Sequence, residues 1–134
     1  MTQHVVTTKP RDSAVHARAV MEEHRVNQLP VIEGPKLVGI VTDRDLRDAF
    51  PSLAETLGRR QPMPKGADPH AIPVEDLMSR DVMTVAPDAS LAAAARLLRR
   101  ERIGAIPVVK SGRLVGILTR SDLLDALIHL LGEE

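Results

Sequence analysis

The sequence predicts an α+β protein made of two copies of one strand–helix–strand–strand–helix unit. Residues 27–50 and 104–127 align without a gap at an offset of 77 and are identical at 11 of 24 positions. In both copies, helical and extended apolar patterns follow one another in the same order. Because such a small unit cannot close a hydrophobic core alone, we expect each copy to bury its apolar face against the other.

Each element follows from a local pattern. A proline two residues after the first extended stretch limits that stretch, and Ser13 or Ser90 then occupies the N-cap position of a helix. Two short apolar runs separated by four turn-forming residues predict a β-hairpin, and a second helix follows it. The expected elements are residues 5–8, 14–24, 29–32, 37–41 and 43–53 in the first copy, and 82–85, 91–100, 106–109, 114–118 and 120–131 in the second.

The segment between the copies has the composition of a surface linker. Residues 58–72 contain three prolines and two glycines and show little apolar pattern. We therefore expect a first domain at residues 1–57, a linker at 58–72 and a second domain at 73–134. Residues 73–77 would form a short helical lead-in to the second domain, with Pro73 near its first turn.

Composition argues against several classes of function. The chain has 18 basic and 18 acidic residues, so no net charge draws it to nucleic acid or to an anionic membrane. It has no cysteine for disulfides, thiolate metal sites or thiol catalysis. The five histidines lack metal-site spacing with carboxylates, and no nucleophile motif is present. We expect a cytoplasmic protein that is not an enzyme and holds no metal.

A Thr-x-x-Asp motif joins each predicted hairpin to the following helix, at Thr42–Asp45 and at Thr119–Asp122. This spacing is that of a capping box, which needs no ligand to explain it. A functional interpretation is also open, because Gly39 and Gly116 permit a chain or a ligand to approach the strand closely. The helix N-terminus attracts anions, and the aspartate can accept hydrogen bonds from a ribose diol.

The complete doubled pattern resembles a known family. Each copy has a Thr-x-x-Pro-x-x-Ser segment and a helix, then an apolar-Pro-Val run, a hairpin and Leu-Val-Gly-Ile-apolar-Thr-x-x-Asp-Leu. This is similar to a tandem pair of CBS domains, also called a Bateman module. The resemblance implies two βαββα units packed pseudo-symmetrically through their sheets. It also implies clefts that bind adenosyl compounds such as AMP, ADP, ATP or S-adenosylmethionine, with no obligatory cofactor.

The resemblance implies a set of ligand-binding residues in each copy. An aspartate would hold the ribose, while a threonine and an arginine would lie toward the phosphates; these are Asp45, Thr42 and Arg44 in the first copy and Asp122, Thr119 and Arg120 in the second. The residues implied to border the adenine are Thr7, Thr8, Pro10, Leu29, Pro30 and Val31 in the first copy, and Thr84, Val85, Pro87, Ile106, Pro107 and Val108 in the second.

The positions just before the Pro-Val runs depart from part of the family. Kinase regulatory subunits of the family carry His or Arg there to grip phosphates, whereas this chain has Asn27-Gln28 and Gly104-Ala105. We therefore do not expect tight polyphosphate binding. The segments VTDRDLRDAFPS and GILTRSDLLDALIHLLG are similar to the CBS half of acetoin-utilisation accessory proteins, in which an ACT domain usually follows.

Three functional hypotheses follow. The first is a regulatory module that senses an adenosyl compound and modulates a partner protein. The alternative is a structural dimerisation module without nucleotide function; in both cases the strongly apolar C-terminal helix indicates a partner subunit and favours a homodimer. The least favoured is nucleic acid binding through Arg59, Arg60 and Lys65 of the linker.

Overall fold

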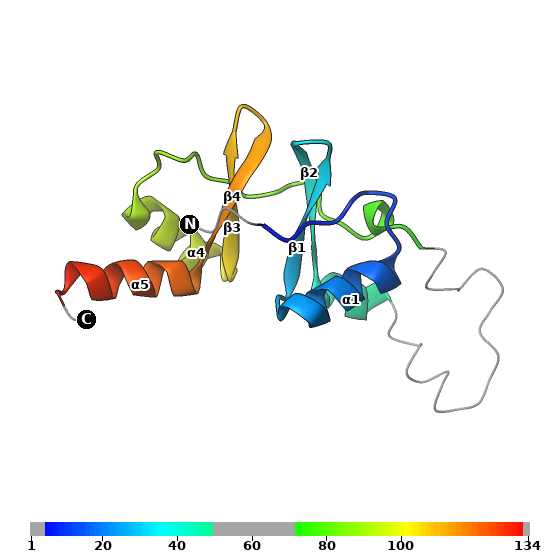
Figure 1. Cartoon of the computed structure of the whole chain (residues 1–134), viewed down its shortest axis with the longest axis horizontal. Helices are drawn as coiled ribbons and strands as arrows, with labels where there is room; N and C mark the ends of the chain where they lie inside the picture. The colour runs from blue at the N-terminus through cyan, green and yellow to red at the C-terminus, as the bar shows by residue number, and fades with distance from the viewer. Residues whose placement is uncertain (1–4, 50–71, 133–134) are drawn as a thin grey trace. The chain divides into compact units, whose positions relative to one another are not determined.

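The computed structural model describes residues 5–49 and 72–132 (Figure 1). Contacts divide the described residues into two compact units, which we call the first unit (Val6–Val82) and the second unit (from Met83 onward, together with Val5). Each unit contains helices and an antiparallel hairpin in the same order along the chain. The α+β class and the duplicated architecture predicted from the sequence are therefore confirmed.

The first unit is built around the hairpin of β1 (Gln28–Glu33) and β2 (Lys36–Thr42). Helix α1 (Ala14–His24) precedes the hairpin and α2 (Asp43–Ala49) follows it. Ser13 caps α1, since its side-chain oxygen accepts a hydrogen bond from the backbone N–H of His16. These positions match the prediction; the expected extension of the second helix to residue 53 lies outside the described residues.

The second unit repeats this arrangement. Helix α4 (Leu91–Glu101) precedes the hairpin of β3 (Ala105–Lys110) and β4 (Arg113–Thr119), and α5 (Arg120–Leu130) follows it. Ser90 caps α4 as Ser13 caps α1. The hairpin loop is shorter than expected, because only Ser111 and Gly112 lie between the strands, both with positive φ (52° and 80°). Two positive φ angles are typical of the tight turn that matches the strand twist.

The predicted extended stretches before α1 and α4 lie beside the first hairpin strand of their own unit. Thr8 forms a parallel bridge with Val31, and Val85 forms the equivalent bridge with Val108. The backbone N–H of Thr8 donates to the carbonyl of Pro30 at 3.0 Å, and its carbonyl accepts from the N–H of Ile32 at 2.9 Å. The Thr-x-x-Pro segment is thereby held against the Pro-Val run in each unit.

The lead-in segment, residues 73–77, packs against the first unit although it comes after the linker in the sequence. It contains the short 3-10 helix η2 (Val74–Asp76), which we expected to open the second domain. Instead, the N–H of Val74 donates to the carbonyl of Asp12 at 2.8 Å, and Ile40 and Ser79 exchange two backbone hydrogen bonds of 2.9 and 2.8 Å. By contacts, therefore, this segment belongs to the first unit, and the boundary between the compact units falls after Val82.

Each unit has its own hydrophobic cluster. In the first unit, the buried residues are Ala14, Ala17, Met21, Leu29, Val31, Val41, Leu46 and Val74. In the second unit they are Ala94, Leu98, Ile106, Val108 and Leu118. The first cluster includes a residue from its second helix and one from the lead-in segment, whereas α5 contributes no fully buried residue to the second.

Candidate functional site

The Thr-x-x-Asp motifs form capping boxes at the junction of hairpin and helix. In the first unit, the N–H of Thr42 donates to Oδ2 of Asp45 at 2.9 Å, and the N–H of Asp45 donates to Oγ1 of Thr42 at 3.0 Å. In the second unit, Thr119 and Asp122 make the same two bonds at 2.9 and 3.2 Å. The structural half of the sequence interpretation is thus confirmed.

The capping boxes leave part of each aspartate available. All four side chains of the two motifs are half-buried rather than enclosed. Within the described part of the chain, Oδ2 of Asp45 and of Asp122 takes the capping bond, and Oδ1 of each accepts no hydrogen bond. A carboxylate can accept about four hydrogen bonds, so each aspartate has unused acceptor capacity at a rigid position.

The start of the first hairpin strand lies next to each capping box. Gln28 pairs with Thr42 across the hairpin, and the carbonyl of Asn27 accepts from the N–H of Asp43 at 2.8 Å. In the second unit, Ala105 pairs with Thr119, and the carbonyl of Gly104 accepts from the N–H of Arg120 at 3.1 Å. The two positions that depart from the family pattern therefore border the Thr-x-x-Asp motif of their own unit.

Several residues implied to border an adenine belong to the hydrophobic core. The side chains of Leu29 and Val31, and of Ile106 and Val108, are buried in the clusters of their units. Pro30 and Pro107 are also fully buried, and each accepts a backbone hydrogen bond through its carbonyl. Since core side chains cannot also line an open site, these segments offer a ligand mainly their backbone.

The Thr-x-x-Pro segments differ between the units. Thr8 is buried, and its hydroxyl donates to Oδ2 of Asp12 at 2.9 Å, whereas the aligned residue of the second unit is Val85. The remaining residues of this group are accessible: Thr7 and Pro10 are half-buried, while Thr84 and Pro87 are exposed. The sequence analysis overlooked Asp12, although its position one residue before the Ser13 cap places it within a turn.

The two arginines implied near the phosphates have different surroundings. Arg44 is exposed and lies 3.9 Å from Asp48, measured from Nε to Oδ2, on the same face of α2. Arg120 is exposed at the start of α5 and lines a groove between α4 and α5. Both side chains are able to move toward an anion, because Arg120 is exposed and an exposed ion pair at this distance holds Arg44 weakly.

Packing explains why a glycine occupies position 39, and the sequence did not predict this packing. A Cβ atom at this position would lie 2.6 Å from Sδ of Met78 and 2.9 Å from the carbonyl oxygen of Ser79. The close approach expected at this glycine therefore occurs, but the approaching chain is the lead-in segment of the same unit. A ligand is not needed to explain Gly39.

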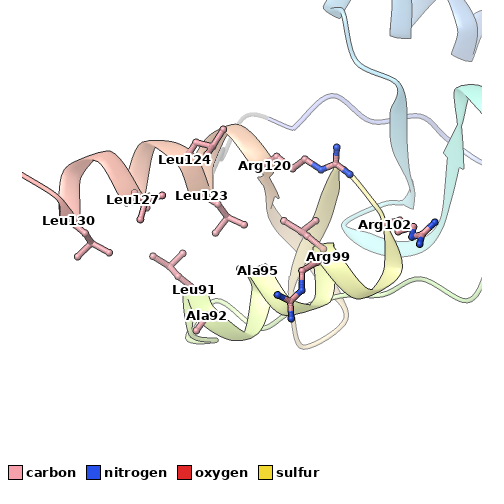
Figure 2. A pocket seen from close by; sticks show the side chains of 12 residues that line it. Leu91, Ala92, Ala95, Arg99, Arg102, Arg120, Leu123, Leu124, Leu127 and Leu130 are labelled. Atoms are coloured by element: carbon pink, nitrogen blue, oxygen red, sulfur yellow. The ribbon is translucent and has the colours of Figure 1, made fainter. Parts of the chain in front are cut away.

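Each unit contains a hollow lined by its own described residues. A polar one of about 590 Å³ in the first unit includes Pro10 and is bordered by Lys9, Arg11 and Arg80. The other, of about 820 Å³, is an apolar groove between the antiparallel helices α4 and α5 (Figure 2). The apolar C-terminal helix pointed to an unpaired surface, but the contribution of α4 to a groove was not predicted.

Comparison with known proteins identifies the family. The family model for the CBS domain matches residues 1–52 and 74–129, so the chain belongs to the CBS domain family. Among curated relatives, an inosine-5'-monophosphate dehydrogenase of Korarchaeum cryptofilum is 37% identical over 119 residues, covering 88% of this chain but 21% of that enzyme. The chain thus spans about a fifth of that relative, and it spans 44% of the next, an uncharacterized protein of Thermofilum pendens.

Solved structures agree with this assignment. The AcuB acetoin utilization protein of Vibrio cholerae has a TM-score of 0.79 and 32% identity, covering 98% of this chain and 89% of that one. The CBS-pair protein CBSX2 of Arabidopsis thaliana, in complex with AMP, has the same TM-score and identity, covering 98% and 94%. The CBS pair of MJ0100, with 5'-methylthioadenosine and S-adenosyl-L-methionine, has a TM-score of 0.71 and 25% identity, covering 97% and 93%. The predicted resemblance to CBS pairs and to acetoin-utilisation proteins is confirmed.

No helix within residues 5–49 and 72–132 has both the length and the apolar composition required to cross a lipid bilayer.

Proposed function

We propose that this CBS pair is a cytoplasmic regulatory module that binds an adenosyl compound at its Thr-x-x-Asp motifs and modulates a partner protein. The proposal rests on the repeated motif, in which one carboxylate oxygen of each aspartate accepts the capping bond. Asp45 and Asp122 are fixed by their capping bonds, and no other described residue donates a hydrogen bond to the second oxygen of either carboxylate. The adenosyl ligands of CBSX2 and MJ0100 support this choice of chemistry.

The chemistry of the motif suits a ribose. A ribose diol presents two hydroxyl donors, which a carboxylate accepts through charge-assisted hydrogen bonds. A flat base would lie against the accessible Thr-x-x-Pro segments, where Thr7 and Pro10 are half-buried and Thr84 and Pro87 exposed, without an aromatic side chain. Positions 27–28 and 104–105 themselves carry no cation to hold a polyphosphate. We expect AMP or S-adenosylmethionine to bind more tightly than ATP.

Isothermal titration with AMP, ATP and S-adenosylmethionine tests the proposal. Saturable heat with at least one of them is expected, and no heat with any of the three at millimolar concentration would refute nucleotide sensing. Asp45→Asn and Asp122→Asn should each weaken one site by about 10- to 100-fold, as loss of a hydrogen bond to a charged group does.

The chain offers matched controls for both variants. Asp48 and Asp125 lie three residues further along α2 and α5, are exposed, and correspond to each other in the repeat. Asp125→Asn removes the same charge from the same helix without touching a capping box. Asp48→Asn does the same in α2 but also releases Arg44, which lies 3.9 Å away, so its effect is compared with that of Arg44→Ala. Equal loss of affinity in test and control variants would mean that general electrostatics, not the Thr-x-x-Asp motif, binds the ligand.

We also propose that the module forms a homodimer, because α5 and the residue after it expose a group of large apolar side chains rather than isolated ones. This surface is also compatible with a second function, namely a structural dimerisation module that binds no nucleotide. The two functions differ in one measurement. Dimer formation without any nucleotide heat supports the structural module, whereas heat that depends on Asp45 or Asp122 supports the sensor.

A further inference from the structure

The polar hollow of about 590 Å³ in the first unit lies at the turn end of the hairpin. Glu33 and Gly34 of that turn line it, whereas the Thr-x-x-Asp motif begins at Thr42, which pairs with Gln28 at the other end of β1. The length of β1, at about 3.3 Å per residue, separates the two ends by roughly 16 Å. Of the residues implied to hold an adenosyl compound, only Pro10 lines the hollow.

Hydrogen bonds fix the backbone around the hollow. The N–H of Glu75 donates to the carbonyl of Pro10 at 2.9 Å, which ties the lead-in segment to the turn before α1. The carboxylate of Asp12 closes that turn, because it accepts from the N–H of Lys9 at 2.9 Å. The chain after the lead-in segment, drawn in green in Figure 1, is held to β2 by the two bonds between Ile40 and Ser79. The side chains on these segments therefore surround one space.

The hollow is lined by three cations and two carboxylates, namely Lys9, Arg11, Arg80, Glu33 and Glu75. All five residues are exposed, and within the described part of the chain none of them forms an ion pair. On α1 and α2, by contrast, arginines pair with carboxylates one turn away on the same helix. The hollow thus presents charges of both signs to a ligand, with one more positive than negative.

These charges are not part of the duplicated pattern. At the offset of 77, the residues aligned with the three cations are uncharged or acidic: Ala86, Asp88 and Gln3. Glu33 aligns with Lys110, so the sign of that charge is reversed as well. The capping boxes and the candidate adenosyl site, which both copies share, do not explain the charges around this hollow. They call for a role that belongs to the first unit.

We propose that the hollow is a second ligand site, which binds a small phosphate ester with free hydroxyl groups, such as a sugar phosphate. Arginine and lysine donate charge-assisted hydrogen bonds to phosphate oxygens. The two glutamates accept hydrogen bonds from the hydroxyl groups of the ligand. The half-buried apolar side chains of Ile32, Val38 and Met78 contact its carbon skeleton.

Charge and size favour this class of ligand. A phosphate ester carries between one and two negative charges near neutral pH, so it suits a lining with an excess of cations better than a neutral zwitterion does. A hollow of about 590 Å³ is within the usual range for small-molecule sites. The inference does not rest on adenosyl binding, because the hollow lies at the opposite end of the hairpin from Asp45.

Isothermal titration of the full chain with glucose 6-phosphate, inorganic phosphate and glucose tests the proposal. Glucose 6-phosphate should bind more tightly than inorganic phosphate, and glucose should not bind. Arg11→Gln with Arg80→Gln should weaken binding about 10-fold or more, as the loss of hydrogen bonds to a charged group does. Arg18→Gln with Arg47→Gln is the matched control, because it removes two exposed arginines from the same unit outside the hollow.

Three outcomes would overturn the proposal. Glucose 6-phosphate could bind no better than inorganic phosphate, or fail to bind at millimolar concentration. The control pair could weaken binding as much as the test pair, which would indicate general electrostatics. Binding could be lost in Asp45→Asn with Asp122→Asn, which would place the phosphate at the Thr-x-x-Asp motifs. Phosphate binding that survives these two changes leaves the second site standing even if no adenosyl compound binds.

Hydrogen exchange gives an independent readout of position. A ligand held between Arg80 and the turn at Lys9 and Arg11 should slow exchange at Glu75 and Ser79, whose amides tie the lead-in segment and the chain after it to the first unit. The amides of β3 and β4 should exchange as before. Protection by glucose 6-phosphate in β3 and β4 without protection at Glu75 and Ser79 would also overturn the proposal.

Discussion

The two units of this CBS pair share their local structure and differ in what covers their helices. Both have a serine cap, a hairpin and a Thr-x-x-Asp capping box at equivalent positions. In the first unit, Leu46 of α2 is buried and the lead-in segment adds Val74 to the core. In the second unit, α5 has no buried residue and borders an open apolar groove. The two units thus share the Thr-x-x-Asp motif and differ in their surfaces.

The two units therefore differ in the chemical character of their exposed helical surfaces. In the first unit, α2 and the lead-in segment both add residues to the buried core, and exposed helical positions carry ion pairs. The second unit leaves apolar side chains exposed, which water disfavours and another protein surface can bury. Changes that act on one unit only are therefore the sharpest way to examine the comparison.

The largest effect is expected where the lead-in segment crosses Gly39. Gly39→Ala should lower the free energy of unfolding by about 2 kcal/mol, because the new methyl group collides with Met78 and with the backbone of Ser79. Urea denaturation measures the loss. Gly104→Ala is the control, since no heavy atom outside its neighbours lies within 4 Å of the added carbon. Similar losses in the two variants would mean that the lead-in segment does not pack as described.

Truncation of Val74 tests the same segment from the core. Val74 is fully buried, and Val74→Ala should cost about 2 kcal/mol through lost burial and the cavity that remains. Hydrogen exchange should accelerate in β1 and β2 and change little in β3 and β4. Glu75→Ala, at the exposed neighbouring position, should leave exchange unchanged. Faster exchange confined to the second unit would assign the segment to that unit and reverse our description.

Removal of the capping threonines compares the two junctions directly. Thr42→Ala and Thr119→Ala should each cost about 1 kcal/mol, the usual value for a lost N-cap. Since α5 has no buried residue to hold it, its amides should exchange faster in Thr119→Ala than those of α2 do in Thr42→Ala. Equal amide exchange rates in α2 and α5, measured on the dilute monomer, would contradict the conclusion that α5 is less buried than α2.

The smallest effect is expected for the charged surface of the first unit. Arg47→Ala removes an exposed ion pair with Asp43 and should change the free energy of unfolding by a few tenths of a kcal/mol. Urea denaturation of both proteins measures the change. A loss of about 1 kcal/mol or more would contradict the description of this pair as exposed.

The secondary structure was largely determined by the sequence itself. The caps at Ser13 and Ser90 and the capping boxes at Thr42 and Thr119 join residues three positions apart, so neighbouring residues alone specify them. The hairpins likewise join adjacent runs through short turns. The duplicated motif also indicated the family and the candidate ligand residues without reference to any tertiary contact.

Other features were decided only by the tertiary structure. Val74 packs beside α1, about 60 residues earlier in the chain, and Gly39 is required by Met78, because cores assemble from distant segments that local patterns cannot pair. The same holds for the burial of Leu29 and Val31, which withdraws their side chains from the candidate site. Sequence repetition thus determined two similar units, and packing buried a residue of the second helix and one of the lead-in segment in the first unit but left an open groove between the helices of the second.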